Sequence, residues 1–242
     1  MPPADHFDGE IAERYDVAHA TMFDRSVVEP VVDRLDKLVG NGAALEFGIG
    51  TGRIALPLAK RGVTVHGIDL SRSMLAALHR KPGADLVQTH VGDFVTTTVD
   101  ASFSLVYLVF NTIMNLTHQA EQVQAFCNAA AHLQPGGRFV VEVMVPELRR
   151  LPPGETTRVF AADTKHWGFD EYDTVSQRLI SHHLEDSADG IRRRSLPLRY
   201  VWPAELDLMA QIAGMEFEQR WGGWQGESFT AHSRSHVSVW RV

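Results

Sequence analysis

Apolar and polar positions along residues 43–145 alternate between strand-like and helix-like spacing. Short, nearly continuous apolar runs predict buried strands at residues 43–47, 63–68, 85–90, 103–110 and 138–145. Between these runs, apolar positions recur at helical spacing over residues 54–61, 72–80 and 118–133, and Ser71 and Thr117 are the expected N-caps of the last two helices. Apolar strands that alternate with helices are typical of a parallel sheet covered on both faces. Because such crossovers are right-handed, we expect a doubly wound α/β fold.

The segments on either side of this region have other patterns. Residues 10–39 have helical periodicity interrupted near Glu29 and Pro30, and Asn41 and Gly42 are expected to end this helix. After residue 146 the apolar and polar positions alternate, which predicts antiparallel strands at residues 157–162, 174–185 and 191–202, with turn chemistry at 186–190. The pattern then predicts a helix at residues 203–213 and strands at 215–220 and 236–242.

We therefore expect one domain with four parts. They are a helical cap at residues 1–40, a core at 41–145, a β flap inserted after the fifth strand at 146–203, and a last helix with two closing strands at 204–242.

Composition excludes several classes of protein. The 242 residues are 44% hydrophobic and 22% charged, as in globular domains. The net charge of −7 lacks the basic excess of a protein that grips nucleic-acid phosphates, so we expect no nucleic-acid partner. The chain has no apolar run of the roughly 18–20 residues that span a bilayer and no basic-then-apolar leader. With a single cysteine, Cys127, these features predict a cytoplasmic protein that does not contact membranes.

A glycine-rich turn follows the first strand. Its sequence is Glu46-Phe47-Gly48-Ile49-Gly50-Thr51-Gly52-Arg53. Glycines between a strand and a helix let a ligand lie against bare backbone N–H groups. A dinucleotide fingerprint would need a third glycine where Arg53 stands, and the chain has no P-loop motif. The turn therefore predicts a nucleotide site of another kind.

Acidic residues end the next two strands. Asp69 follows the second strand, where a carboxylate can accept hydrogen bonds from ribose hydroxyls. Asp93 and Phe94 follow the third, where a carboxylate and a ring suit the amine and the face of an adenine. The pattern indicates an adenine nucleoside. An N-cap role is an alternative for Asp93.

Together, these motifs resemble those of class I S-adenosylmethionine-dependent methyltransferases, particularly the small-molecule, natural-product members. The likeness covers roughly residues 43–145 and includes Leu133-Gln134-Pro135-Gly136-Gly137 before the fifth strand. It implies a Rossmann-like sheet of parallel strands with a final antiparallel strand, S-adenosylmethionine as cofactor and S-adenosylhomocysteine as product. More loosely, the flap is similar to that of amino-sugar N-methyltransferases from antibiotic pathways, which implies that it binds substrate.

The resemblance also implies roles for individual residues. Glu46 and the backbone of Gly48, Gly50 and Gly52, with the adjoining Arg53, would hold the methionine part of the cofactor. Asp69 would bind the ribose, Leu70 an adenine face, and Asp93 with Phe94 the adenine edge and ring. Tyr15 in Arg14-Tyr15-Asp16 resembles the N-terminal tyrosine that small-molecule members fold over the methionine carboxylate. A buried helix tyrosine is the alternative.

Candidate acceptor residues follow from topology, because ligands of open α/β sheets lie beyond the carboxyl ends of the strands. Asn111, Met114 and Asn115 follow the fourth strand, Met144 ends the fifth, and Trp221, Trp224 and His232 follow the sixth. Trp221 and Trp224 could wall an acceptor or simply pack at an edge. Many relatives carry histidine where Asn115 stands. The candidate catalytic residues are therefore Asn111, Asn115, His182 and His232, although His182 shares a strand face with Ile180 and Leu184 and could be a packed residue.

These observations predict methyl transfer from S-adenosylmethionine to a nitrogen or electron-rich carbon of a small molecule in natural-product biosynthesis, mainly by positioning. An O-methyltransferase with a histidine base, or a non-catalytic protein that binds the cofactor, are the alternatives. No His/Cys spacing suggests a metal site. We expect a monomer or a homodimer.

Overall fold

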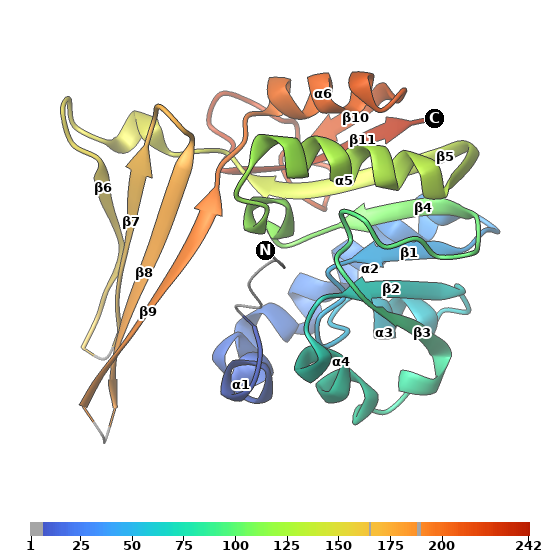
Figure 1. The fold of residues 1–242 in the computed structure, drawn as a ribbon, viewed down its shortest axis with the longest axis horizontal. Coiled ribbons are helices and arrows are strands. Elements are labelled where there is room, and N and C mark those ends of the chain that lie inside the picture. Colours follow the sequence, from blue (N-terminus) through green and yellow to red (C-terminus); the bar gives the residue numbers. More distant parts are fainter. Residues whose placement is uncertain (1–6, 165, 188–189) are drawn as a thin grey trace.

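A seven-stranded sheet forms the centre of the protein. The computed structural model describes residues 7–164, 166–187 and 190–242 (Figure 1). The strands of this sheet are β1 (Ala44–Phe47), β2 (Val65–Asp69), β3 (Val87–Val91), β4 (Phe103–Leu108), β5 (Leu133–Met144), β10 (Glu216–Trp221) and β11 (Ser235–Arg241). Their order is β10-β11-β5-β4-β1-β2-β3, with β1 to β5 parallel and β11 antiparallel to both neighbours. The predicted doubly wound sheet is confirmed.

Helices cover both faces of this sheet because its strands are apolar on both sides. The helices are α2 (Arg25–Val39), α3 (Ala55–Ala59), α4 (Arg72–His79), α5 (Gln119–His132) and α6 (Pro203–Ile212). α2, α3 and α4 bury Leu35, Leu58 and Leu78 against one face, whereas α5 and α6 bury Phe126 and Leu206 against the other (Figure 1). No helix in the described part of the chain has the length and apolarity needed to cross a bilayer.

The N-terminal helix breaks earlier than its sequence predicts. It divides into α1 (Glu10–Ala18), η1 (Ala20–Phe23) and α2, so the predicted break near Glu29 and Pro30 is wrong and Pro30 lies inside α2. The break falls before α2 because α1 turns to pack on the glycine-rich loop, where Asp16 accepts a hydrogen bond from Thr51.

One of the two predicted N-caps is confirmed. The Ser71 hydroxyl accepts a hydrogen bond from the Met74 N–H at 3.2 Å, as expected of the residue that precedes and caps α4. Thr117 is not the N-cap of α5. His118 takes that place, because its backbone N–H donates to the Glu121 carboxylate in a capping box.

The flap is a separate antiparallel sheet. Its strands are β6 (Thr157–Ala162), β7 (His166–Asp173), β8 (Arg178–Ser187) and β9 (Gly190–Arg199), in that order. The prediction of three strands with one at 174–185 is wrong, because residues 166–173 form a strand and residues 174–177 form the turn after it. β8 and β9 pair from Arg178 with Arg199 to Ser187 with Gly190, and residues 188–189 of the predicted hairpin turn lie outside the described residues.

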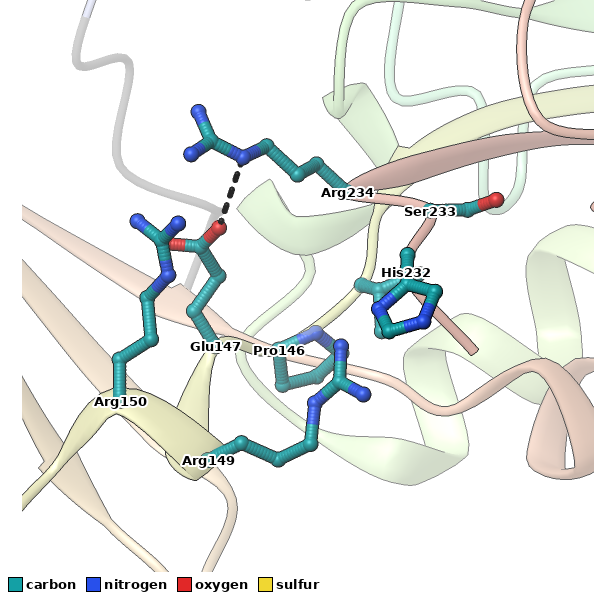
Figure 2. Close-up of a pocket in the computed structure, with 8 residues that line it drawn as sticks. Pro146, Glu147, Arg149, Arg150, His232, Ser233 and Arg234 are labelled. Carbon is teal, nitrogen blue, oxygen red and sulfur yellow. Dashed lines mark ion pairs between the residues drawn. The ribbon is translucent and has the colours of Figure 1, made fainter. Parts of the chain in front are cut away.

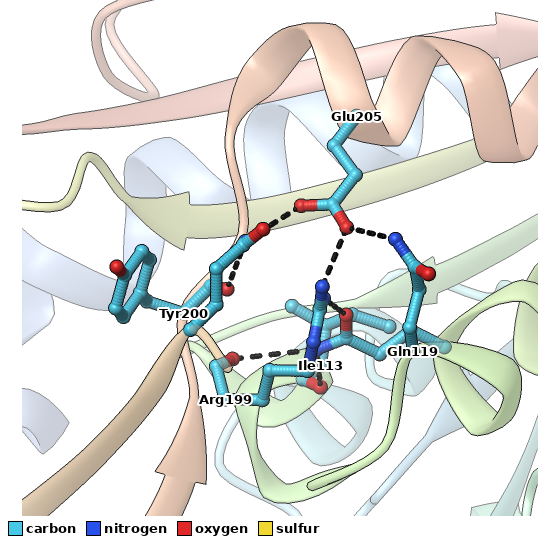
Figure 3. Close-up of polar contacts among 7 residues, drawn as sticks. Ile113, Gln119, Arg199, Tyr200 and Glu205 are labelled. Atoms are coloured by element: carbon cyan, nitrogen blue, oxygen red, sulfur yellow. Dashed lines mark hydrogen bonds and ion pairs between the residues drawn. The ribbon is translucent and has the colours of Figure 1, made fainter. Parts of the chain in front are cut away.

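A buried polar cluster anchors the flap to the core (Figure 3). Arg199, the last residue of β9, is only 4% exposed and donates to Glu205 of α6 at 2.7 Å and to Gln122 of α5 at 2.5 Å. Gln122 donates in turn to the carbonyl of Ile113 in η3 (Thr112–Asn115) at 3.1 Å. Gln119 and Gln177 donate to the two oxygens of Glu205. The cluster therefore joins the base of the flap to two helices and to the loop after β4.

Candidate active site

The glycine-rich loop presents bare backbone at the carboxyl end of β1. Gly48, Gly50 and Gly52 have φ values of 69°, 54° and 80°, a left-handed conformation that glycine adopts without strain. The Gly48 N–H donates to the Ile68 carbonyl at 2.8 Å, which holds the loop against β2. A Cβ at Gly48 would lie 2.7 Å from the Thr112 side chain. The loop is therefore a narrow cradle between the ends of β1, β2 and β4.

Asp69 fixes this loop to the end of β2. One carboxylate oxygen accepts the Gly50 N–H at 2.7 Å and the other accepts the Ser71 N–H at 2.9 Å. The Asp69 carbonyl accepts the Gly92 N–H at 2.9 Å, which brings the end of β3 to the same edge. Leu70 is half-buried beside Asp69. The structure thus brings together three segments that the sequence analysis selected, namely the glycine-rich loop, the end of β2 and the end of β3.

Asp93 and Phe94 follow directly at the end of β3. The Asp93 carboxylate accepts the Val95 N–H at 2.9 Å, and its carbonyl accepts the N–H groups of the next turn. The Phe94 ring stacks on Phe47 with 5.4 Å between centroids. Asp93 therefore initiates a turn and places Phe94 at the rim of the core.

Glu46 is a buried carboxyl inside β1. It is 3% exposed, and the Tyr107 hydroxyl donates to its Oε2 at 3.0 Å. Burial raises the pKa of Glu46 to about 8, although the Tyr107 hydrogen bond and the Arg53 charge both act to lower it. A cation placed against this carboxyl would stabilise its charged form.

Helix α1 lies over the glycine-rich loop. The Asp16 carboxylate accepts a hydrogen bond from the Thr51 hydroxyl at 2.6 Å and pairs with Lys81, whose Nζ donates to the Thr51 carbonyl at 2.7 Å. The Tyr15 ring is 4.4 Å from the His19 ring, and His19 contacts Phe110 edge-on at 6.0 Å. Burial raises the pKa of the Tyr15 phenol, and Arg53 and Arg194 oppose that shift. Asp16 thus reaches the loop, whereas the predicted Tyr15 packs on His19, which contacts Phe110. The sequence analysis did not select Asp16 or His19.

The chain bends sharply at the end of β4. Phe110 and Asn111 have φ values of 58° and 62°, which costs a non-glycine residue about 1–3 kcal/mol. Glu142 of β5 holds them, since its Oε2 accepts the Phe110 N–H at 2.8 Å and its carbonyl accepts the Asn111 N–H at 3.2 Å. The Asn111 side-chain oxygen accepts the Met144 N–H at 2.7 Å, and the Arg53 guanidinium lies 4.9 Å from the Phe110 ring centre. Asn111 is therefore a structural link between β4 and β5.

The other predicted acceptor residues are dispersed around this edge. Met114 is 1% exposed and belongs to the core, whereas Asn115 and Met144 are half-buried. Trp221 and Trp224 pack towards α2: the Arg34 guanidinium lies 4.4 Å from the Trp221 ring centre, and Arg34 donates to the Trp224 carbonyl at 3.4 Å. His232 is exposed and lines a cavity beyond the end of β5.

The two adjacent histidines of the flap point to opposite faces. His182 stacks on Phe169 at 4.6 Å and its Nδ1 lies 2.8 Å from the Ser195 hydroxyl, on the face opposite to Arg194. His183, which the sequence analysis did not select, lies on the other face with Arg194, whose guanidinium is 5.4 Å from the Phe7 ring. Burial lowers the pKa of His183, and the charges of His166 and Arg194 add to this effect.

Comparisons with known proteins agree with this geometry. Residues 44–137 match a methyltransferase domain family. The structure of the CcbJ methyltransferase from Streptomyces caelestis is 35% identical, with a TM-score of 0.86 over 96% of both chains. The cypemycin N-terminal methyltransferase of a Streptomyces species is 29% identical over 240 residues, 96% of both chains. An amino pentose methyltransferase from Micromonospora echinaspora, solved with S-adenosylmethionine bound, is 26% identical with a TM-score of 0.69, over 94% of this chain and 96% of that one.

The fold and the glycine-rich cradle define a nucleoside-binding α/β enzyme of the methyltransferase class. The chain belongs to the S-adenosylmethionine-dependent methyltransferases, and its cofactor is S-adenosylmethionine.

Proposed function

We propose that this enzyme methylates a nitrogen atom of a small natural-product acceptor, mainly by positioning it. The observation that carries the proposal is the end of β4, where Asn115 is a neutral amide, the Asn111 oxygen accepts the Met144 N–H and the Glu142 carboxylate accepts the Phe110 N–H. A neutral amine attacks with its own lone pair, whereas a hydroxyl group needs a proton acceptor. A relative that aligns along nearly the whole chain is by its name an N-terminal methyltransferase, that of cypemycin. This similarity supports nitrogen as the acceptor atom.

The residues present fit the cofactor. The glycine-rich loop leaves space beside Gly50, where a Cβ would meet no atom closer than 4.0 Å, and the buried Glu46 carboxyl gains a charge partner if a methionine ammonium group lies against it. Asp69, at the end of β2, would accept the ribose hydroxyls, and Asp93 with Phe94 would bind the adenine. The Arg53 charge acts to lower the pKa of the Tyr15 phenol, and the two side chains would hold the methionine carboxylate. When bound, S-adenosylmethionine supplies an electrophilic methyl group on a sulfonium.

Two elements would keep water from the reacting atoms. α1 lies on the glycine-rich loop through Asp16 and Thr51, and the inner face of the flap meets the segment before α1 through Arg194 and Phe7. With α1 and the flap over the site, the acceptor nitrogen would be held in line with the methyl group. Holding the two reacting atoms in line is how positioning raises the rate.

The test is product analysis with isotopically labelled cofactor. The enzyme is incubated with S-adenosylmethionine labelled in its methyl group and with matched panels of amines, indoles and phenols. We expect labelled N-methyl products and formation of S-adenosylhomocysteine that depends on the amine. Label confined to C-methyl or O-methyl products would overturn the proposal.

The same assay tests the O-methyltransferase alternative. A histidine base at His182 or His232 predicts that alanine at one of these positions lowers kcat steeply and removes a limb of the pH profile. Under our proposal, both variants keep kcat within about threefold of the wild-type value, because His182 packs on Phe169 on the flap face opposite to Arg194 and His232 is an exposed residue of a surface cavity.

A further inference from the structure

A basic cavity lies beyond the end of β5 (Figure 2). It has a volume of about 340 Å³ and forms between residues 145–150, which follow β5, and residues 232–234, which precede β11. The Val145 N–H donates to the Arg234 carbonyl at 2.8 Å, which holds the two segments together. The cavity therefore has a fixed frame in the central sheet.

Positive charge predominates in this cavity. Its lining includes Arg149, Arg150 and Arg234 but one carboxylate, Glu147, although the chain as a whole carries −7. Arg150 and Arg234 are 50% and 69% exposed, so their guanidinium groups remain open to a ligand. A cluster of three arginines that shares one carboxylate partner keeps positive charge that suits phosphate or carboxylate groups.

Glu147 orients these arginines without neutralising them. Its side chain is 12% exposed and pairs with Nη1 of Arg150 and with Nε of Arg234, both at 3.6 Å. Arg158 of β6 forms a third, closer ion pair with it. Arg149 instead donates through Nη1 to the Ala231 carbonyl. One buried carboxylate thus holds part of the cluster in place.

The cavity lies next to the proposed acceptor site. Its first lining residue, Val145, follows Met144, whose N–H donates to Asn111 at the end of β4. A second, mainly apolar cavity of about 430 Å³ shares Arg149 and Ser233 with it and is also lined by Trp202 and Phe229. A ligand in the pair of cavities would therefore combine an anion with an apolar or aromatic group.

We propose that this arginine cavity binds an anionic group, a phosphate or a carboxylate, that the acceptor carries apart from its reactive nitrogen. The inference rests on the proposed function for the identity of the reactive atom. It defines the substrate as an anionic amine: the guanidinium groups of Arg149 and Arg234 hold the anion while the amine end reaches past Met144 towards the cofactor.

Anion binding tests the cavity without any methyl transfer. Pyrophosphate and succinate are titrated calorimetrically into the full-length protein at low salt, with Arg80→Gln as the matched control, because Arg80 caps the far end of α4. We expect one of the two anions to bind with one-to-one stoichiometry, and Arg149→Gln/Arg234→Gln to weaken it about tenfold or more, whereas Arg80→Gln does not. Thermal unfolding and S-adenosylhomocysteine binding verify that the double variant is folded. The cavity is not an anion site if neither anion binds, or if the double variant binds as wild type does.

Paired acceptors test the substrate class. Each amine is assayed with and without its anionic group, as an amino-sugar nucleoside diphosphate against the free amino sugar, and as a peptide with a free carboxyl terminus against its amide. We expect the anionic member of one pair to have a KM about tenfold lower or more in wild type, and the advantage to disappear in Arg149→Gln/Arg234→Gln. Turnover of amines with no preference for the anionic member refutes this inference but leaves N-methylation standing. Binding of an anion without turnover of any amine refutes N-methylation but leaves the cavity as an anion site.

Discussion

Tyr107 donates a hydrogen bond to Glu46 across the centre of the sheet, with 3.0 Å between its hydroxyl and Oε2. The two residues are register partners on β4 and β1, and both are almost inaccessible to solvent. A neutral phenol orients the carboxyl but brings no positive charge, so the pKa of Glu46 is raised by burial to about 8. The ligand-free protein therefore holds a carboxyl that its cofactor can ionise.

Cofactor binding is expected to release a proton at neutral pH. If the methionine ammonium group lies against Glu46, bound ligand favours the charged carboxylate, whereas the free protein holds the proton below a pKa of about 8. The affinity for S-adenosylhomocysteine should then rise by up to roughly tenfold per pH unit between pH 6 and 8 and level off above. Calorimetry in buffers of different ionisation enthalpy measures the released proton.

Glu46→Gln provides the control for that linkage. The amide keeps the shape and the Tyr107 contact but cannot ionise, so the proton release should vanish and the affinity should fall about tenfold or more. A wild-type pH dependence that persists in this variant would assign the linkage to another group.

The same carboxyl lowers the stability of the ligand-free protein as pH rises. Its pKa is raised from 4.5 to about 8, so its contribution is fully present below pH 4.5 and is lost as pH rises towards 8. One pKa unit corresponds to about 1.4 kcal/mol, which makes the loss of the order of a few kcal/mol. Glu46→Gln should therefore raise the unfolding free energy at pH 8 but change it little at pH 5. Urea unfolding at the two pH values measures the difference, and an equal effect at both would contradict it.

Asp16 is expected to couple α1 to the cofactor. Asp16→Ala removes the hydrogen bond from Thr51 and the ion pair with Lys81, so α1 should leave the loop more often. We expect the affinity for S-adenosylhomocysteine to fall about three- to tenfold, while the unfolding free energy changes by less than about 1 kcal/mol. Limited proteolysis within α1 should become faster.

Glu13→Ala is the matched control for Asp16, because Glu13 is an exposed acid on the same helix. It should leave both the affinity and the proteolysis rate unchanged. If the two variants behave alike, the contact with Thr51 has no role in binding.

The backbone at Asn111 can be tested by two substitutions with different costs. Asn111→Ala loses the acceptor for the Met144 N–H and places alanine at a φ of 62°, so it should destabilise the protein by about 2–3 kcal/mol. Asn111→Gly loses the same acceptor but adopts that φ freely, and its cost should be about 1 kcal/mol lower. Equal losses of unfolding free energy would show that the left-handed backbone carries no strain.

The cofactor side of the site could be predicted from sequence because its signals are local. The spacing of Glu46, the glycines and Asp69 lies within two adjacent strand–loop units, and these units meet at one edge of any parallel sheet. The long apolar runs of β1, β2 and β4 likewise indicate a sheet buried on both faces. Local pattern and tertiary fold agree in this region.

The flap could not be predicted as well because its periodicity is obscured. β7 was missed since its inward positions include Gly168, which Phe160 covers, and Asp170, which is 7% exposed beside Ser181. A glycine and an acidic residue do not indicate buried positions in a sequence, so the alternating pattern of β7 is not apparent. Strand parity separates His182 from His183, but only the long-range contact of Arg194 with Phe7, before α1, shows that the face of His183 and Arg194 is the inner one.

Arg199 should be the most costly single residue of the flap to remove. Arg199→Met deletes the cation that pairs with Glu205 and leaves the Gln122 carbonyl oxygen without its donor, in a site where Arg199 is 4% exposed. Breaking a buried pair by removing one partner costs about 3–5 kcal/mol, so the midpoint of urea unfolding should fall markedly. Arg199→Met/Glu205→Gln should recover part of this loss, because an amide at position 205 removes the uncompensated charge.

Arg178→Met is the matched control, since Arg178 is the exposed register partner of Arg199 on β8. It should change the unfolding free energy by less than about 0.5 kcal/mol. If Arg199→Met costs no more than Arg178→Met, the cluster in Figure 3 does not hold the flap on the core.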